Sequence, residues 1–169
     1  MVARTPPDQL GSETELMLPL SNENPDTVLI CYDGSDGARW AIDAAGAVIS
    51  ARRAVVLNVG PPLTLIESVA LTNPGIFDFE RDNTAVATDI AEEGAELARR
   101  AGFDAKPNVL LGAPVWGSIV SYAGTIDATL IVLGSRALTP AGQMIRGSVS
   151  HQVAQHAQRP VFIVPQPRN

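Results

Sequence analysis

The chain has few of the residues on which several common kinds of protein chemistry depend. Its one cysteine, Cys31, excludes an internal disulfide framework and any metal site built from several thiolates. Its one lysine, Lys106, stands directly before a proline, so a lysine that clamps phosphate or forms a Schiff base has one poor candidate. No apolar run approaches the roughly 20 residues needed to cross a bilayer.

An excess of positive charge is also missing. The 169 residues include 12 basic and 18 acidic ones, for a net charge of -6, and most of that excess lies in residues 1–26. No basic face is implied, which disfavours general binding to nucleic acid or to an anionic membrane. The first twenty residues lack the basic and apolar segments of a signal peptide, so we expect a soluble, cytoplasmic protein.

Length and composition fit one domain with a tail, because hydrophobic residues make up 46% of the chain and can close a core. Residues 1–25 contain scattered proline, glutamate, serine and asparagine without a clear period, and we expect a mostly disordered acidic extension. Its apolar residues could still dock on the body or on a partner: Leu16, Met17, Leu18 and Leu20. Residues 26–169 form the predicted domain.

Within that domain, short apolar runs alternate with helical patterns. The runs predict strands at 27–32, 54–59, 107–111, 128–133 and 161–164. Helices are predicted at 38–50, 84–101 and 148–158, with a further one that opens at Pro114. This order predicts an α/β fold, an open parallel sheet with helices on both faces. Ligands of such sheets bind beyond the carboxyl ends of the strands, where the strand order reverses.

Two predictions concern single segments. In the helix at 84–101, the buried stripe is expected to consist of Val86, Ile90, Leu97 and Ala101, with Gly102 ending the helix. The connection at 60–83 is long and partly apolar, and a lid, a dimer contact and plain packing all fit its composition.

Several familiar catalytic motifs are absent. The chain has no Walker-type GxxxxGK[ST], no GxGxxG after the first predicted strand and no GxSxG. His151 and His156 are five residues apart, which puts them about 140° apart around a helix. We expect surface or capping roles for both, and we predict no metal ligands. Cys31 is expected to fill the core.

The loop after the fourth predicted strand is the most informative segment. Two glycine-containing stretches, residues 134–137 (GSRA) and 147–150 (GSVS), flank nine residues. Free backbone N–H groups at the start of the following helix would point toward an anion, and Arg136 and Arg146 lie in the same loop. The alternative is that Gly134 makes a turn and Ser148 caps the helix.

In this context the chain resembles the universal stress protein family, from about Thr27 to Pro165. Nucleotide-binding members of that family carry Gly-x2-Gly-x9-Gly-Ser/Thr after the fourth strand; here Gly134, Gly147 and Ser148 match, and Ala137 replaces the second glycine. Further similar stretches are residues 32–35 (YDGS), 112–114 (GAP) and 159–165 (RPVFIVP).

The resemblance implies a Rossmann-like fold of the adenine nucleotide α-hydrolase type, with strand order 3-2-1-4-5. It also implies a pocket for ATP, or for ADP or AMP, with magnesium held mainly by phosphate oxygens. In that pocket Asp33 would lie near the adenosine, and Val59 would meet adenine through its backbone. Gly112 would leave room beside the ribose, and Gly134 and Arg136 would border the ribose and the phosphates. The phosphate chain would be held by the residues at the start of the last helix: Gly147, Ser148, Val149 and Ser150.

Each assignment has a structural alternative. Asp33 could cap the next turn, Val59 could be a core residue, Gly112 could be a turn glycine, and Arg136 could be a solvated charge.

The function implied by the resemblance is that of a small cytoplasmic, ATP-binding stress-response protein that regulates rather than catalyses. One alternative is a family member without nucleotide that acts through protein contacts, which the alanine at position 137 favours. Another is a slow ATPase, although no nucleophile and base can be named.

A homodimer is also implied. The last predicted strand would be an apolar sheet edge, formed by Val161, Phe162, Ile163 and Val164, that a second copy could cover. The alternative is that residues 1–25 cover it.

Overall fold

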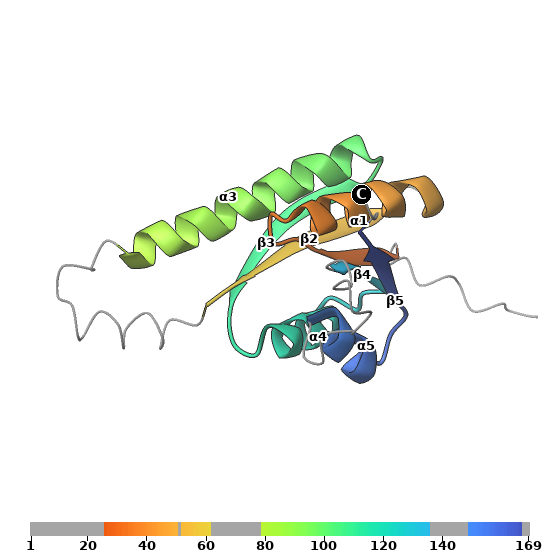
Figure 1. Ribbon diagram of the computed structural model, residues 1–169. Helices are drawn as coiled ribbons and strands as arrows, with labels where there is room; N and C mark the ends of the chain where they lie inside the picture. The colour runs from red at the N-terminus through yellow and green to blue at the C-terminus, as the bar shows by residue number, and fades with distance from the viewer. Residues whose placement is uncertain (1–25, 51, 62–78, 136–148, 167–169) are drawn as a thin grey trace, which may run out of the picture.

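The computed structural model describes residues 26–50, 52–61, 79–135 and 149–166, and these contain one five-stranded parallel sheet. The strands are β1 (Thr27–Cys31), β2 (Arg53–Gly60), β3 (Asp104–Leu111), β4 (Leu130–Ser135) and β5 (Val161–Pro165). The helices are α1 (Asp36–Val48), α3 (Phe79–Arg100), α4 (Val115–Thr125) and α5 (Val149–His156). The strand order is β3-β2-β1-β4-β5 (Figure 1), which confirms the predicted order and fold class.

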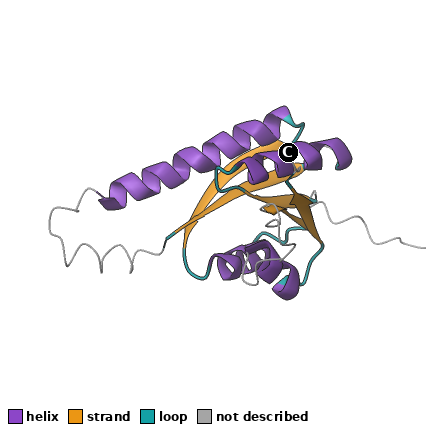
Figure 2. Cartoon of the chain, viewed as in Figure 1, coloured by secondary structure: helices purple, strands orange, loops and turns teal. Residues whose placement is uncertain are grey.

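Helices cover both faces of the sheet, and each face has its own core. Figure 2 shows α1 and α3 on one side and α4 and α5 on the other. Residues of β1 alternate between the two cores: Val28 and Ile30 pack under α1 and α3, while Leu29 packs toward α4 and α5. The strand sequences are continuous apolar runs because helices cover the side chains on both faces of the sheet.

The contact of α3 with the sheet differs from the prediction. The helix begins at Phe79, not at position 84, and from position 84 on its buried residues are small: Ala87, Ala91, Gly94, Ala95 and Ala98. A Cβ on Gly94 would lie 2.6 Å from Cδ1 of Tyr32. The predicted stripe was wrong at Val86, which is 54% exposed, while Ile90, Leu97 and Ala101 are only partly buried at its margin. The helix lies so close to the sheet that small residues must face it.

A serine begins helix α1, and a glycine ends helix α3. Ser35 is the N-cap of α1, and its hydroxyl oxygen accepts a hydrogen bond from the Ala38 N–H at 3.2 Å. Beyond α3, Gly102 has a φ of 97°, its N–H donates to the Arg99 carbonyl, and the Phe103 N–H donates to the Ala98 carbonyl. These two bonds form a Schellman motif, which confirms Gly102 as the residue that ends the helix.

Other boundaries moved by a few residues. The strand predicted at 107–111 begins at Asp104, and the one predicted at 128–133 begins at Leu130. Most of the predicted connection at 60–83 and the whole extension at 1–25 lie outside the described residues. None of the helices that the structure describes is both long and apolar enough to span a membrane.

Candidate functional site

The strand order reverses between β1 and β4. From β1 the sheet continues through β2 to β3 on one side, and from β4 it continues to β5 on the other. In a parallel sheet of this kind the crevice for a ligand opens at the carboxyl ends of the two central strands. The residues that follow β1 and the last residues of β4 therefore form the walls of the candidate site.

The turn after β1 is held by its own polar side chains. The Asp33 carboxylate accepts a hydrogen bond from the Ser35 N–H at 3.1 Å, and Gly34 between them has a φ of 79°. Asp33 itself is exposed. Its carboxylate thus stabilises the turn, as the structural alternative predicted, and remains accessible at the sheet edge.

The other wall is formed by the end of β4, where the backbone of Gly134 packs directly against the backbone of Gly37 in α1. A Cβ built on Gly134 would lie 2.3 Å from the Gly37 carbonyl oxygen and 2.5 Å from the carbonyl carbon. No real side chain tolerates such distances, so the end of β4 can approach the first turn of α1 only with glycine at position 134. Fold packing alone therefore requires Gly134.

Val59 and Gly112 lie at the ends of β2 and β3. Val59 is partly buried against the core under α4 and α5, and the Gly112 N–H donates to the Gly60 carbonyl at 3.1 Å. A Cβ on Gly112 would lie 2.5 Å from Oγ of Ser118, so this glycine makes room for a serine of α4.

The predicted phosphate-binding segment is only partly within the described residues. Helix α5 begins at Val149, which is partly exposed, and Ser150 is buried. Because α5 returns the chain to the start of β5, its first residues lie toward the carboxyl ends of the strands. Arg136, Ala137, Arg146, Gly147 and Ser148 lie outside the described residues.

Two polar contacts at this edge were not predicted. Asn58 is buried, and its side-chain N–H donates to the Tyr32 carbonyl at 2.9 Å, which ties the end of β2 to the end of β1. An asparagine within the apolar run at 54–59 was the available signal, but its partner lies 26 residues away in the sequence.

The second is a cluster of Tyr32, Arg39 and Glu93, from the β1 turn, α1 and α3. The Tyr32 hydroxyl donates to Glu93 Oε1 at 3.0 Å and accepts from Arg39 Nε at 3.0 Å. The guanidinium and the carboxylate also pair directly, with Arg39 Nη2 2.8 Å from Glu93 Oε1. Burial raises the pKa of Tyr32 above its ordinary value, so the phenol stays protonated and can donate.

The histidine and the cysteine considered in the sequence analysis, His156 and Cys31, make contacts that stabilise the fold. His156 is exposed; its ring nitrogen Nδ1 donates to the Gln152 carbonyl at 2.9 Å, and the ring stacks on Trp116 with centroids 4.4 Å apart. Cys31 packs at the margin of the core, and burial of the thiol raises its pKa. In the part of the chain that the structure describes, no three His, Cys, Asp or Glu residues gather in a metal-binding group.

Comparison with known proteins decides the family. The model of the universal stress protein family matches residues 25–165. The chain belongs to this family. The universal stress protein YxiE of Bacillus subtilis (strain 168) is 31% identical to it over 144 residues, which cover 81% of this chain and 97% of YxiE.

Solved structures of other universal stress proteins share the fold. One, crystallised in complex with cAMP, is 26% identical, covers 83% of this chain and 97% of its own, and superposes with a TM-score of 0.59. Another, from Archaeoglobus fulgidus in complex with dAMP, is 18% identical, with coverages of 82% and 95% and a TM-score of 0.54. The family and the Rossmann-like fold predicted from the sequence are thereby confirmed.

Proposed function

We propose that this universal stress protein binds an adenine nucleotide, in the crevice between the ends of β1 and β4, and that it regulates rather than catalyses. The observation that carries the proposal is the reversal of strand order between β1 and β4, with the exposed Asp33 carboxylate on one wall. The relative in complex with cAMP, at 26% identity, supports an adenine nucleotide as the ligand class.

The residues present fit such a ligand. Asp33 offers carboxylate oxygens that can accept from ribose hydroxyls, and Val59 offers backbone groups at the strand end to adenine. Gly112 and Gly134 keep the strand ends free of side chains. The phosphates would be held by the start of α5 (Val149 and Ser150) together with Arg136, Gly147 and Ser148, which lie outside the described residues. A magnesium ion would be held mainly by phosphate oxygens.

The ligand is ATP in this proposal, and a direct test is available. Protein is denatured after purification and the released material is read at 260 nm, while a second sample is titrated calorimetrically with ATP, ADP, AMP and cAMP. Retained nucleotide or saturable binding supports the proposal, with ATP expected to bind tightest. The absence of both at millimolar ligand overturns it.

A conservative substitution tests the position of the site. Asp33→Asn keeps an oxygen that can accept from Ser35 and removes the charge, so the turn should persist while ATP affinity falls about tenfold, or ~1.4 kcal/mol. The matched control is Asp36→Asn, which removes a neighbouring exposed carboxylate in the first turn of α1. Equal affinities of the two variants would place the ligand elsewhere.

A second candidate function is a family member that acts through protein contacts without nucleotide. It is favoured by the packing at Gly134, since the close approach to the backbone of Gly37 alone accounts for that glycine. The same titration separates the two functions. Turnover is expected to be negligible in either, and phosphate release above about 1 s⁻¹, the low end of ordinary enzymes, would contradict that.

The same proposal includes a cytoplasmic homodimer. Strand β5 lies at the sheet edge, and Val161, Phe162 and Ile163 are only partly buried within the single chain. The prediction was wrong at Val164, which is buried in the core under α1 and α3 and is not available to a second copy. Ile163→Lys should convert a dimer to a monomer in light scattering, while Val86→Lys, at an exposed valine of α3, should leave it unchanged. A wild-type monomer would contradict this part of the proposal.

A further inference from the structure

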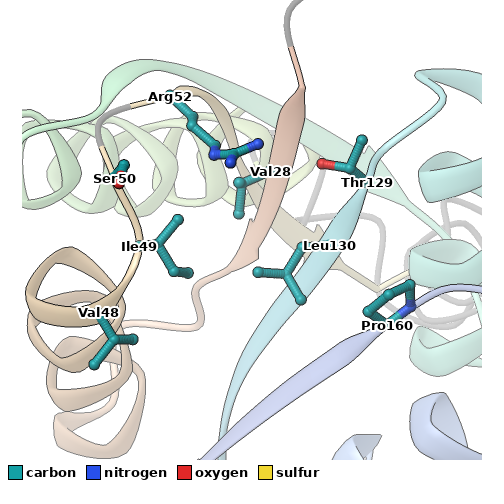
Figure 3. Close-up of a pocket in the computed structure, with 8 residues that line it drawn as sticks. All are labelled: Val28, Val48, Ile49, Ser50, Arg52, Thr129, Leu130 and Pro160. Atoms are coloured by element: carbon teal, nitrogen blue, oxygen red, sulfur yellow. The ribbon is translucent and has the colours of Figure 1, made fainter.

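A hollow of about 400 Å³ lies at the amino ends of the strands, opposite the candidate nucleotide crevice. Figure 3 shows its lining side chains, which come from the end of α1 and the two residues after it, from β1, from the start of β4, and from the residues that precede β2, β4 and β5. They are Val28, Val48, Ile49, Ser50, Arg52, Thr129, Leu130 and Pro160. We name this feature the amino-edge hollow.

The walls of the amino-edge hollow are largely apolar and reach the surface. Val28 is buried at its base, Ile49 and Leu130 are half-buried, and Val48 at its rim is 69% exposed. The volume greatly exceeds the ~30 Å³ that one water occupies in the liquid. An apolar depression of this size is a place where an apolar segment gains free energy by leaving water.

The polypeptide enters the domain at the rim of this hollow. Asp26 is the first described residue, and Val28, two residues later, lines the hollow. The Asp26 carboxylate is ion-paired with the guanidinium of Arg52, which also lines it. Residues 1–25 therefore join the domain beside the hollow, whatever path they take from there.

The sequence of that extension matches the chemistry of the hollow. Residues 16–20 (LMLPL), here called the apolar segment, are a run of large apolar side chains between acidic stretches that contain Glu15 and Glu23. Residues 21–25 (SNENP) are rich in turn-forming types, so the chain can reverse there. The six Cα–Cα steps from Leu20 to Asp26 can span about 20 Å when extended, enough to fold back over the rim.

We propose that the apolar segment docks in the amino-edge hollow of its own chain, so that the acidic extension is a built-in cover of this edge of the sheet. The tether favours this occupant over a second copy, because a short linker raises the local concentration of the segment to about the millimolar range. This inference stands on the hollow and the chain entry and does not depend on nucleotide binding.

Disulfide trapping in the full-length chain tests the docking. Cys31 is first replaced by valine, and the background is checked by its melting curve. Leu18→Cys is then combined with Val48→Cys at the rim, or with Asp104→Cys as the matched control. Asp104 is exposed at the start of β3, two strands from β1 at the same edge, so it is also within reach of the tether.

We expect an intramolecular disulfide between positions 18 and 48 to form at least about tenfold faster than one between 18 and 104, because docking raises the effective concentration of the thiol. Adding Leu16→Ser and Leu20→Ser leaves the tether length unchanged and should remove this difference. Equal rates for the two pairs, a difference that survives the serine substitutions, or disulfides formed only between chains would each overturn the proposal; the last would identify a second copy as the occupant.

Discussion

The two edges of the sheet are built by different means. At the carboxyl edge, backbone meets backbone: Gly134 touches Gly37, and the Gly112 N–H donates to Gly60. At the amino edge, side chains surround a hollow of about 400 Å³. Helix α1 spans both, with a glycine contact in its first turn and with Val48 and Ile49 at its end. Residue identity is therefore tightly constrained at one edge and loosely at the other.

The largest expected effect is that of Gly134→Ala at the carboxyl edge. The new Cβ would collide with the backbone of Gly37, which no side-chain rotation can relieve, so unfolding free energy should fall by about 3 kcal/mol or more. Urea unfolding measures the loss. In the matched control Gly124→Ala, in α4, the new Cβ meets no atom within 4 Å beyond the local helix backbone, and a gain of up to about 1 kcal/mol is expected. Similar stability of the two variants would mean that the contact opens readily.

The next effect is a dependence on pH through Cys31, the last residue of β1. Burial raises the pKa of its thiol in the folded chain, so the unfolded chain loses this proton first, near its ordinary pKa of about 8.5. The stabilisation is complete below that pH and declines as pH rises, by at most about 1.4 kcal/mol per pH unit. Urea unfolding between about pH 8 and 9.5, below the ordinary titration of tyrosine, should show this slope, and Cys31→Val should flatten it. An unchanged slope in the variant would assign the effect to other groups.

Removing the Tyr32 hydroxyl should have a smaller effect. Tyr32→Phe deletes the group that bridges Arg39 and Glu93, but these two still pair directly and are about half exposed, so a loss of about 1 kcal/mol is expected. Tyr122→Phe is the control, because among the described residues no hydrogen bond to the Tyr122 hydroxyl is observed. Thermal or urea unfolding compares them, and equal losses would show that the bridge adds nothing.

The smallest effect is expected at the amino edge. The Thr129 hydroxyl donates to the Thr27 carbonyl at 3.3 Å, but the Thr129 N–H already donates to the same oxygen at 2.9 Å. Thr129→Ala should therefore change unfolding free energy by less than about 0.5 kcal/mol. Ser35→Ala at the opposite edge removes a helix cap and should cost about 1 kcal/mol. If Thr129→Ala proved the more harmful, the contrast between the edges would fail.

The sequence predicts the fold because local signals agree with it. Apolar runs such as 27–32 mark strands covered on both faces, and Ser35 and Gly102 mark helix ends through bonds within a few residues. The stripe of α3 was misplaced because periodicity was read from large side chains such as Val86. The sheet approaches this helix so closely that alanine and Gly94 face it instead.

The candidate site was less accessible to sequence reasoning. The turn at Asp33 is local and was anticipated, but the reasons for Gly134 and Gly112 lie in contacts with α1 and α4 that no spacing rule contains. The bond from Asn58 to the Tyr32 carbonyl likewise joins residues that only the parallel pairing of β1 and β2 brings together. Long-range packing decides these positions.

The contact between Gly134 and Gly37 also bears on how motifs in such chains are read. Any sequence in which the first helix packs this closely against the fourth strand must have glycine at the position of Gly134, whether or not a ligand is bound. The first glycine of the Gly-x2-Gly-x9-Gly pattern is thus a signature of architecture. A screen for nucleotide-binding members should therefore rely on the later positions of the pattern, which correspond to residues 137, 147 and 148 of this chain.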